Sequence, residues 1–208
     1  MLSSKGRVFT DAVFGPVARL LVRMGIGPDA VTITASSLAI VAALWLIPTG
    51  HLVLGPLVVT ALVLADSIDG LMARERGYTT RWGAFLDSTF DRATDAAIFS
   101  GLLLWGVREN EAWIVVLSLA CLVLGSIVPY ARARAEGLGM SASGGIAERA
   151  DRLALAGVVT FATGLGAPVW VLGAGLVVLA LASVWTIGQR MARVYRQARG
   201  DAGREEAA

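Results

Sequence analysis

Apolar residues gather into six long runs along this chain, separated by short polar or basic segments. The runs span residues 31–47, 52–69, 83–107, 112–131, 152–165 and 168–189. A helix needs ~17–25 mostly apolar residues to cross the ~30 Å hydrocarbon core of a bilayer, and every run except 152–165 is that long. The pattern therefore predicts an all-α integral membrane protein with six transmembrane helices.

The segments between the runs are of two kinds, and they differ in charge. Three links carry turn-forming residues and a single basic side chain, Arg108: Pro48-Thr49-Gly50, Arg108-Glu109-Asn110 and Gly164-Leu165-Gly166. The basic residues gather in the other segments and near the termini: Lys5, Arg7, Arg19, Arg23, Arg74, Arg76, Arg81, Arg132, Arg134, Arg149, Arg152, Arg190, Arg193, Arg196, Arg199 and Arg204. Because basic loops stay on the cytoplasmic side, the sequence predicts a multi-pass protein of the cell membrane with both termini in the cytoplasm.

The composition indicates one membrane domain. Apolar residues make up 56% of the chain and charged residues 16%, with a mean hydropathy of +0.68, which excludes an ordinary soluble domain and a nucleic-acid-coating protein. We divide the chain into a juxtamembrane segment (1–30), a six-helix bundle (31–190) and a cytoplasmic tail (191–208). Within the tail we expect residues 193–208 to be a frayed helix end followed by disorder. Helical spacing of apolar residues in 1–30 favours an amphipathic helix in the headgroup plane over a helix packed on the bundle: Phe9, Val13, Val17, Leu20 and Met24.

Five carboxylates lie inside the predicted spans, where an acid costs ~2.5–3.5 kcal/mol on insertion scales. Asp66 and Asp69 are three residues apart at the end of the second span, and Asp87, Asp91 and Asp95 follow at intervals of four at the start of the third. Helical geometry puts each set on one face, and the short basic link 74–81 brings the two sets to the same depth near the cytoplasmic surface. So many carboxylates at one place require neutralisation.

Oxygen ligands without histidine or cysteine suit a hard cation such as Mg²⁺ or Mn²⁺. Two such ions bridged by shared carboxylates would hold a diphosphate and stabilise a leaving phosphate. Two alternatives remain. The aspartates could pair with nearby arginines alone (Arg74, Arg76, Arg81 and Arg92), or they could mark the ion pathway of a divalent-cation transporter.

The spacing of these residues resembles a known signature. Residues 66–91 fit D-x-x-D-G-x-x-A-R-x(8)-G-x-x-x-D-x-x-x-D at every fixed position. This pattern is similar to that of the CDP-alcohol phosphotransferase family. The resemblance implies a homodimer of six-helix protomers that transfers a phosphatidyl group from CDP-diacylglycerol to an alcohol and releases CMP.

The same resemblance implies roles for the motif residues. Asp66, Asp69 and Asp87 would ligate one metal ion and Asp66, Asp87 and Asp91 a second, with Asp91 also the general base. The implied CDP-diacylglycerol contacts are Pro28, Asp29, Thr32, Gly70, Ala73, Arg74 and Gly83. For Asp29 an N-cap role is an equal alternative, because it directly precedes a predicted helix.

The acceptor alcohol is predicted from the arginines that flank the cytoplasmic ends of the last three spans. An acceptor with its own phosphate would need such a cationic pocket, whereas attraction to lipid headgroups is the alternative for any one of them. Residues 130–139, 144–153 and 189–190 resemble actinobacterial phosphatidylinositol phosphate synthases, which implies inositol phosphate as acceptor. Its phosphate would be held mainly by Arg152 and Arg190, with Arg132 and Arg149 nearby. Pro129 departs from the serine usual there and removes a hydroxyl donor. A phosphatidylglycerophosphate synthase, whose acceptor is glycerol phosphate, remains the alternative within the family.

Overall fold

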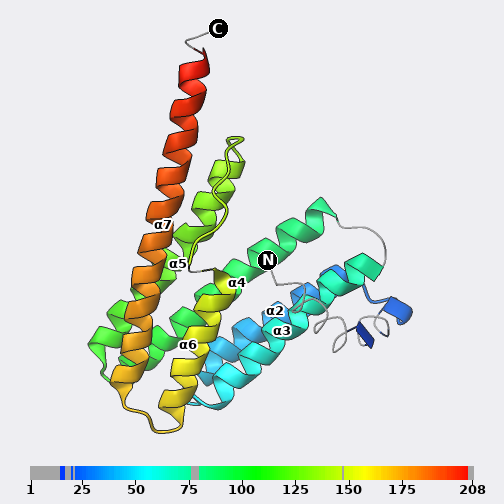
Figure 1. Ribbon diagram of the computed structural model, residues 1–208. Helices are drawn as coiled ribbons and strands as arrows, with labels where there is room; N and C mark the ends of the chain where they lie inside the picture. The colour runs from blue at the N-terminus through cyan, green and yellow to red at the C-terminus, as the bar shows by residue number, and fades with distance from the viewer. Residues whose placement is uncertain (1–14, 17–19, 21, 76–79, 147, 206–208) are drawn as a thin grey trace.

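Six long helices make up most of the chain that the structure describes (Figure 1). This computed structural model describes residues 15–16, 20, 22–75, 80–146 and 148–205, without the side chains of 67–71, 73–75 and 200–205. The helices are α2 (Pro28–Leu46), α3 (Leu54–Glu75), α4 (Arg81–Arg108), α5 (Ala112–Glu136), α6 (Arg149–Gly164) and α7 (Val169–Glu205). The described residues contain no strand, so the all-α prediction is confirmed, with one helix for each apolar run.

Residues with special backbone preferences set the helix ends. Pro28 occupies the first turn of α2, where its missing N–H costs nothing, and the Thr80 hydroxyl at the start of α4 accepts the Gly83 N–H at 2.9 Å. The three predicted turns are present. Each contains a residue with positive φ: Gly50 at 87°, Asn110 at 59° and Gly166 at 102°.

Three helices end well beyond their apolar runs. α3 continues to Glu75, α5 to Glu136 and α7 to Glu205. The helix end expected in 193–208 is therefore present, and the residues described up to Glu205 are helical where disorder was expected to follow. Arginine, glutamate and alanine are strong helix formers, and the Arg199 guanidinium lies 4.8 Å from the centre of the Tyr195 ring one turn earlier. Helical propensity thus carries α7 beyond its apolar part. The predicted interfacial segment 1–30 lies mostly outside the described residues.

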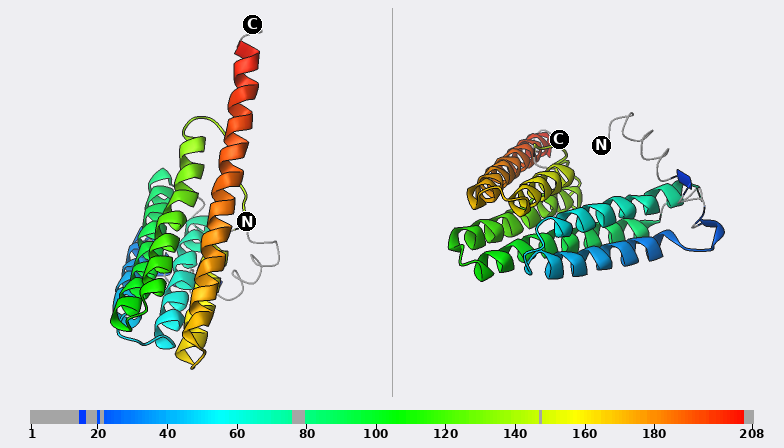
Figure 2. Two further views of the ribbon diagram at one scale, coloured as in Figure 1. Left: turned by 90° about the vertical axis from the view of Figure 1, so that its left-hand side faces the viewer. Right: turned by 90° about the horizontal axis from the view of Figure 1, so that it is seen from below.

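The helices run roughly side by side, and their ends form two distinct faces (Figures 1 and 2). The turns α2–α3, α4–α5 and α6–α7 lie at one end, and the facing ends of α3 and α4, the α5–α6 loop and the end of α7 lie at the other. α2 packs on α3 and α4, α4 on α5, and α7 on α5 and α6, whereas α3 touches α6 more sparingly. This loose seam between α3 and α6 positions the site described below.

Apolar side chains fill the core and also cover much of the outer surface. Phe99, Leu102 and Ile114 are fully buried, yet Trp45, Trp170 and Trp185 are each more than 60% exposed. Among the residues that the structure describes with side chains, three helices are long and apolar enough to cross a membrane, namely Pro28–Leu46, Ala112–Glu136 and Val169–Arg199, and Leu54–Asp66 is a shorter apolar stretch. α4 falls outside this set because it carries charged residues of the site, and α6 because it has only 16 residues. The molecule is a helical membrane protein.

Close contact between α2 and α4 gives a test of the packing. A Cβ on Gly101 of α4 would lie 2.6 Å from the backbone oxygen of Ala43 in α2, an atom that cannot move aside alone. We expect Gly101→Ala to lower the melting temperature by several degrees, because overpacking costs ~1–3 kcal/mol. Thermal unfolding in detergent measures it.

The matched control for this prediction is Gly188→Ala in α7. A Cβ there would meet nothing within 4 Å, so the melting temperature should hold or rise, since alanine is ~0.5–1 kcal/mol better than glycine inside a helix. Equal melting temperatures for wild type and Gly101→Ala would show that α2 and α4 separate without cost.

Candidate active site

Three aspartates from two helices meet in one cluster. Asp66 lies on α3, and Asp87 and Asp91 lie one turn apart on α4. One carboxylate oxygen from each lies within 4.8 Å of the other two, while burial decreases from Asp66 to Asp91 to Asp87. The Ser36 hydroxyl of α2 donates to Asp66 Oδ1 at 3.3 Å. Convergent oxygens at this spacing can share a hard divalent cation, so the described residues fit the predicted metal.

Four residues of the motif lie outside the described side chains: Asp69, Gly70, Ala73 and Arg74. Their backbone belongs to α3, on the same helix as Asp66. Their roles stay predictions. The described part of the motif, which joins Asp66 to Asp87 and Asp91, has the proximity that the sequence predicted.

The predicted donor contacts near the start of α2 lie beside Gly83. A Cβ on Gly83 would stand 3.5 Å from Asp29 Oδ1 and 3.1 Å from Thr80 Oγ1, so a larger residue would crowd this corner. Gly27 is the N-cap of α2 and Asp29 lies in its first turn, so the N-cap alternative for Asp29 is wrong. The Thr32 hydroxyl is buried and donates to the Pro28 carbonyl at 3.2 Å. The first turn of α2 and the start of α4 thus form one corner of the site.

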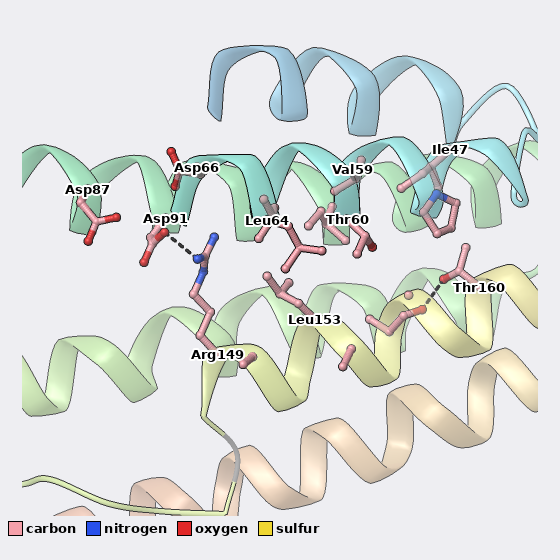
Figure 3. A pocket seen from close by; sticks show the side chains of 17 residues that line it. Ile47, Val59, Thr60, Leu64, Asp66, Asp87, Asp91, Arg149, Leu153 and Thr160 are labelled. Carbon is pink, nitrogen blue, oxygen red and sulfur yellow. Dashed lines mark hydrogen bonds and ion pairs between the residues drawn. The ribbon is translucent and has the colours of Figure 1, made fainter. Parts of the chain in front are cut away.

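A cavity of about 470 Å³ extends from the aspartate cluster along the seam between α3 and α6. Figure 3 shows Asp66, Asp87 and Asp91 at one end of it, with Arg149 opposite, and Ile47 at the other end. Between these ends the walls are mostly apolar: Val59, Val63, Leu64, Leu153, Ala156 and Gly157. The cavity can therefore hold a molecule with one charged end and one hydrocarbon end.

Two arginines of α6 bind the acids of α4 directly, an interaction that the sequence reasoning missed. Arg149 Nη1 lies 2.6 Å from Asp91 Oδ1, and Arg149 Nε lies 2.9 Å from Asp95 Oδ1. Arg152 Nη2 lies 3.0 Å from Asp95 Oδ2. Of the arginines considered as partners for the aspartates, Arg92 alone has an ion pair among the described contacts, at 3.4 Å to Asp91. A signal existed in the sequence, since Asp91 and Asp95 share one helix face and Arg149 and Arg152 share another.

The other two predicted acceptor ligands lie on α5 and α7. Arg190 is buried and donates to the carbonyls of Val128 and Gly144, the latter at 3.3 Å. It interacts electrostatically with both Arg132 and Arg152. Arg132 itself is exposed, with its Nε 2.8 Å from Glu136 Oε1. The structure therefore joins Arg149 and Arg152 on one carboxylate, places Arg190 close by, and turns Arg132 toward its own helix.

The fold and the site define a helical membrane protein with an acidic, oxygen-only cluster beside buried arginines. The family model for CDP-alcohol phosphatidyltransferase matches residues 26–185. A phosphatidylinositol phosphate synthase of Mycobacteroides abscessus is 43% identical over 182 residues, covering 86% of this chain and 82% of that protein. The same enzyme of Streptomyces avermitilis is 40% identical over 205 residues, covering 95% and 84%.

Solved structures agree with these sequence relatives. The crystal structure of Mycobacterium tuberculosis phosphatidylinositol phosphate synthase in complex with manganese and citrate aligns with a TM-score of 0.84 at 40% identity, over 88% of this chain and 89% of that one. The structure of that enzyme with CDP-DAG bound gives 0.83 at 39%, over 88% and 94%. This chain belongs to the CDP-alcohol phosphatidyltransferase family, and it is a transferase rather than the cation transporter that the acids alone left open.

Proposed function

We propose that this protein transfers a phosphatidyl group from CDP-diacylglycerol to inositol phosphate, giving phosphatidylinositol phosphate and CMP. The observation that carries the proposal is the direct contact between Asp91 of the aspartate cluster and Arg149 of α6, at the charged end of an apolar cavity. The acids and the cavity suit the diphosphate and the acyl chain of the donor, and the arginines suit the phosphate of a phosphorylated acceptor. The relatives named above carry the same activity in their names.

The donor would bind along the cavity. Its diphosphate would lie by Arg74 and the acids Asp66, Asp69, Asp87 and Asp91. Its cytidine would lie by Pro28, Asp29, Thr32, Gly70, Ala73 and Gly83, and an acyl chain would lie along the α3–α6 walls. Two divalent cations, Mg²⁺ or Mn²⁺, would neutralise the diphosphate and the leaving CMP when bound. Manganese is present in the related Mycobacterium tuberculosis structure. The glycines and alanine leave room for close approach of the nucleotide.

Residues of this chain would bind the acceptor and accept its proton during the transfer. Arg152 and Arg190, with Arg149 and Arg132 nearby, would hold the acceptor phosphate through charge-assisted hydrogen bonds. Asp91 would accept the proton of the attacking acceptor hydroxyl, which then attacks the β-phosphorus of the donor. The contact of Asp91 with Arg149 supports this arrangement, in which the base lies beside the acceptor pocket.

We also propose that all six helices span the cell membrane with both termini and the site on the cytoplasmic side, and that two copies form a homodimer. Exposed tryptophans at 45, 170 and 185 support lipid contact, and clustered arginines at one end support the orientation. The dimer and the interfacial helix in 1–30 rest on the family resemblance and on the spacing of apolar residues.

Incorporation of radiolabelled acceptor into lipid by the purified enzyme tests the proposal. With CDP-diacylglycerol present, inositol phosphate should give a labelled lipid at a rate far above that with glycerol phosphate. The reverse preference would assign the chain to phosphatidylglycerophosphate synthesis. No label from either acceptor would reject a phosphorylated acceptor altogether.

Substitution of Arg152 or Arg190 by alanine should weaken use of the acceptor. We expect kcat/KM for inositol phosphate to fall tenfold or more, because a charge-assisted hydrogen bond contributes ~1.5–3 kcal/mol. The KM for CDP-diacylglycerol should change little. Steady-state kinetics with each substrate varied in turn measures both.

Arg196→Ala is the control for these variants. Arg196 is exposed on α7, and its Nε donates to the Ala192 carbonyl of its own helix at 3.2 Å. Its loss should leave the kinetics unchanged. Pro129→Ser, which restores the hydroxyl usual in the subfamily, should lower the acceptor KM. Unchanged acceptor kinetics in both Arg152→Ala and Arg190→Ala would remove the acceptor assignment and leave the family assignment intact.

A further inference from the structure

Asp95 stands apart from the other acids of the site. It follows Asp91 by one helical turn on α4, but the metal-suited cluster among the described residues consists of Asp66, Asp87 and Asp91. Both oxygens of Asp95 instead face α6: Oδ1 accepts from Arg149 Nε at 2.9 Å, and Oδ2 accepts from Arg152 Nη2 at 3.0 Å. Each carboxylate oxygen of Asp95 thus accepts a hydrogen bond from an arginine of α6 in this structure.

This carboxylate fixes two guanidinium groups at once. The Arg152 side chain is 4% exposed and that of Asp95 13%, so the pair lies where solvent screens little. Arg149 is held at its Nε by Asp95, and its Nη1 reaches Asp91 at 2.6 Å. A planar guanidinium anchored through one edge has a defined direction for its remaining N–H groups. Asp95 therefore sets where Arg149 and Arg152 point.

Arg149 is able to bind an anion in addition to the two aspartates. A guanidinium has five N–H donors, and the contacts of Arg149 with Asp91 and Asp95 use only part of them, next to the aspartate where the acceptor hydroxyl would lose its proton. We propose that Asp95 is a positioning residue for the acceptor, which holds Arg149 and Arg152 in the orientation that receives the acceptor's phosphate. This inference rests on the proposed function, because it presumes a phosphorylated acceptor.

The test is Asp95→Asn in the purified full-length enzyme. An amide keeps the shape but loses one acceptor oxygen and the charge, so Arg149 and Arg152 lose their common anchor. We expect the KM for inositol phosphate to rise about tenfold, with the KM for CDP-diacylglycerol and the affinity for Mn²⁺ unchanged. Asp95→Glu keeps the charge and should recover part of the loss. A merely structural role would move both KM values and the melting temperature together.

Asp151→Asn is the matched control, since Asp151 is exposed in the first turn of α6 next to Arg152. It should leave both KM values unchanged. In an Arg152→Ala background, Asp95→Asn should raise the acceptor KM much less than in wild type, because one of the two guanidinium groups that Asp95 orients is already absent. Should Asp95→Asn fail to give a monodisperse protein, Asp95→Glu carries the test, with a selective rise in acceptor KM expected.

Three outcomes would overturn the inference: an unchanged acceptor KM, an equal change in both KM values, or a loss of Mn²⁺ affinity, which would make Asp95 a metal ligand. Failure of the proposed function is recognised separately, because it would appear in the wild-type enzyme as no incorporation of inositol phosphate. In that case binding of inorganic phosphate to wild type and Asp95→Asn decides the role of Asp95. Equal affinities would reject it.

Discussion

Asp91→Asn is expected to lower kcat by ~10²–10⁴-fold while CDP-diacylglycerol still binds, because the amide keeps the shape of the side chain but cannot take up a proton. Asp91 is the aspartate of the cluster that also contacts an arginine of α6. Its carboxylate belongs to the cluster with Asp66 and Asp87, and it also contacts Arg149 at 2.6 Å. Single-turnover kinetics with saturating donor and a separate donor-binding measurement check the two halves of this expectation.

Two further variants make the Asp91 result interpretable. Asp66 is buried in the cluster, so Asp66→Asn should lose Mn²⁺ binding and donor binding together. Glu109→Gln changes an acid at the opposite end of α4 and should leave turnover unchanged. Near wild-type turnover in Asp91→Asn would show that another group accepts the proton.

Removal of divalent cations is expected to abolish activity reversibly. The cluster offers carboxylate oxygens only, which favour Mg²⁺ or Mn²⁺ and give zinc no soft ligand. Treatment with EDTA should therefore bring turnover to background, and added Mg²⁺ or Mn²⁺ should restore it. Paramagnetic resonance of free Mn²⁺, titrated with wild type and with Asp66→Asn, measures binding without any substrate present.

The wild-type titration should show saturable Mn²⁺ binding, and Asp66→Asn should leave most of the ion free. Full turnover after complete removal of metal would contradict the metal-assisted mechanism. Saturable binding by Asp66→Asn equal to that of wild type would place the ion elsewhere in the molecule.

Much of the fold was predictable because hydrophobic runs report directly on which residues are buried or face lipid. The helix ends were less so. Residues 132–135 alternate arginine and alanine, and Glu136 follows them. This polar stretch ends the apolar run but continues helix α5, because helical propensity does not depend on apolar character. The i,i+4 ion pair between Arg132 and Glu136 could have been predicted from that spacing.

The acidic cluster was predictable for a different reason. Asp87 and Asp91 are four residues apart and therefore share a face of α4. Because only a short link joins the end of α3 to the start of α4, Asp66 near the end of α3 must lie close to them. The pairing of Asp95 with Arg149 and Arg152 was not predictable in the same way. It depends on how α6 lies against α4, and the loop of twelve residues between Glu136 and Arg149 leaves that geometry open.

The length of α7 has a practical consequence. Its 37 residues extend about 55 Å at ~1.5 Å per residue, while a hydrocarbon core of ~30 Å uses only about 20 of them. With α7 spanning the membrane as proposed, the remaining turns would extend the end of this helix about 20 Å or more beyond the lipid boundary. A fluorophore or affinity tag joined there would stand away from the lipid surface, and its distance from a label near the α5–α6 loop would report on any movement of that loop during turnover.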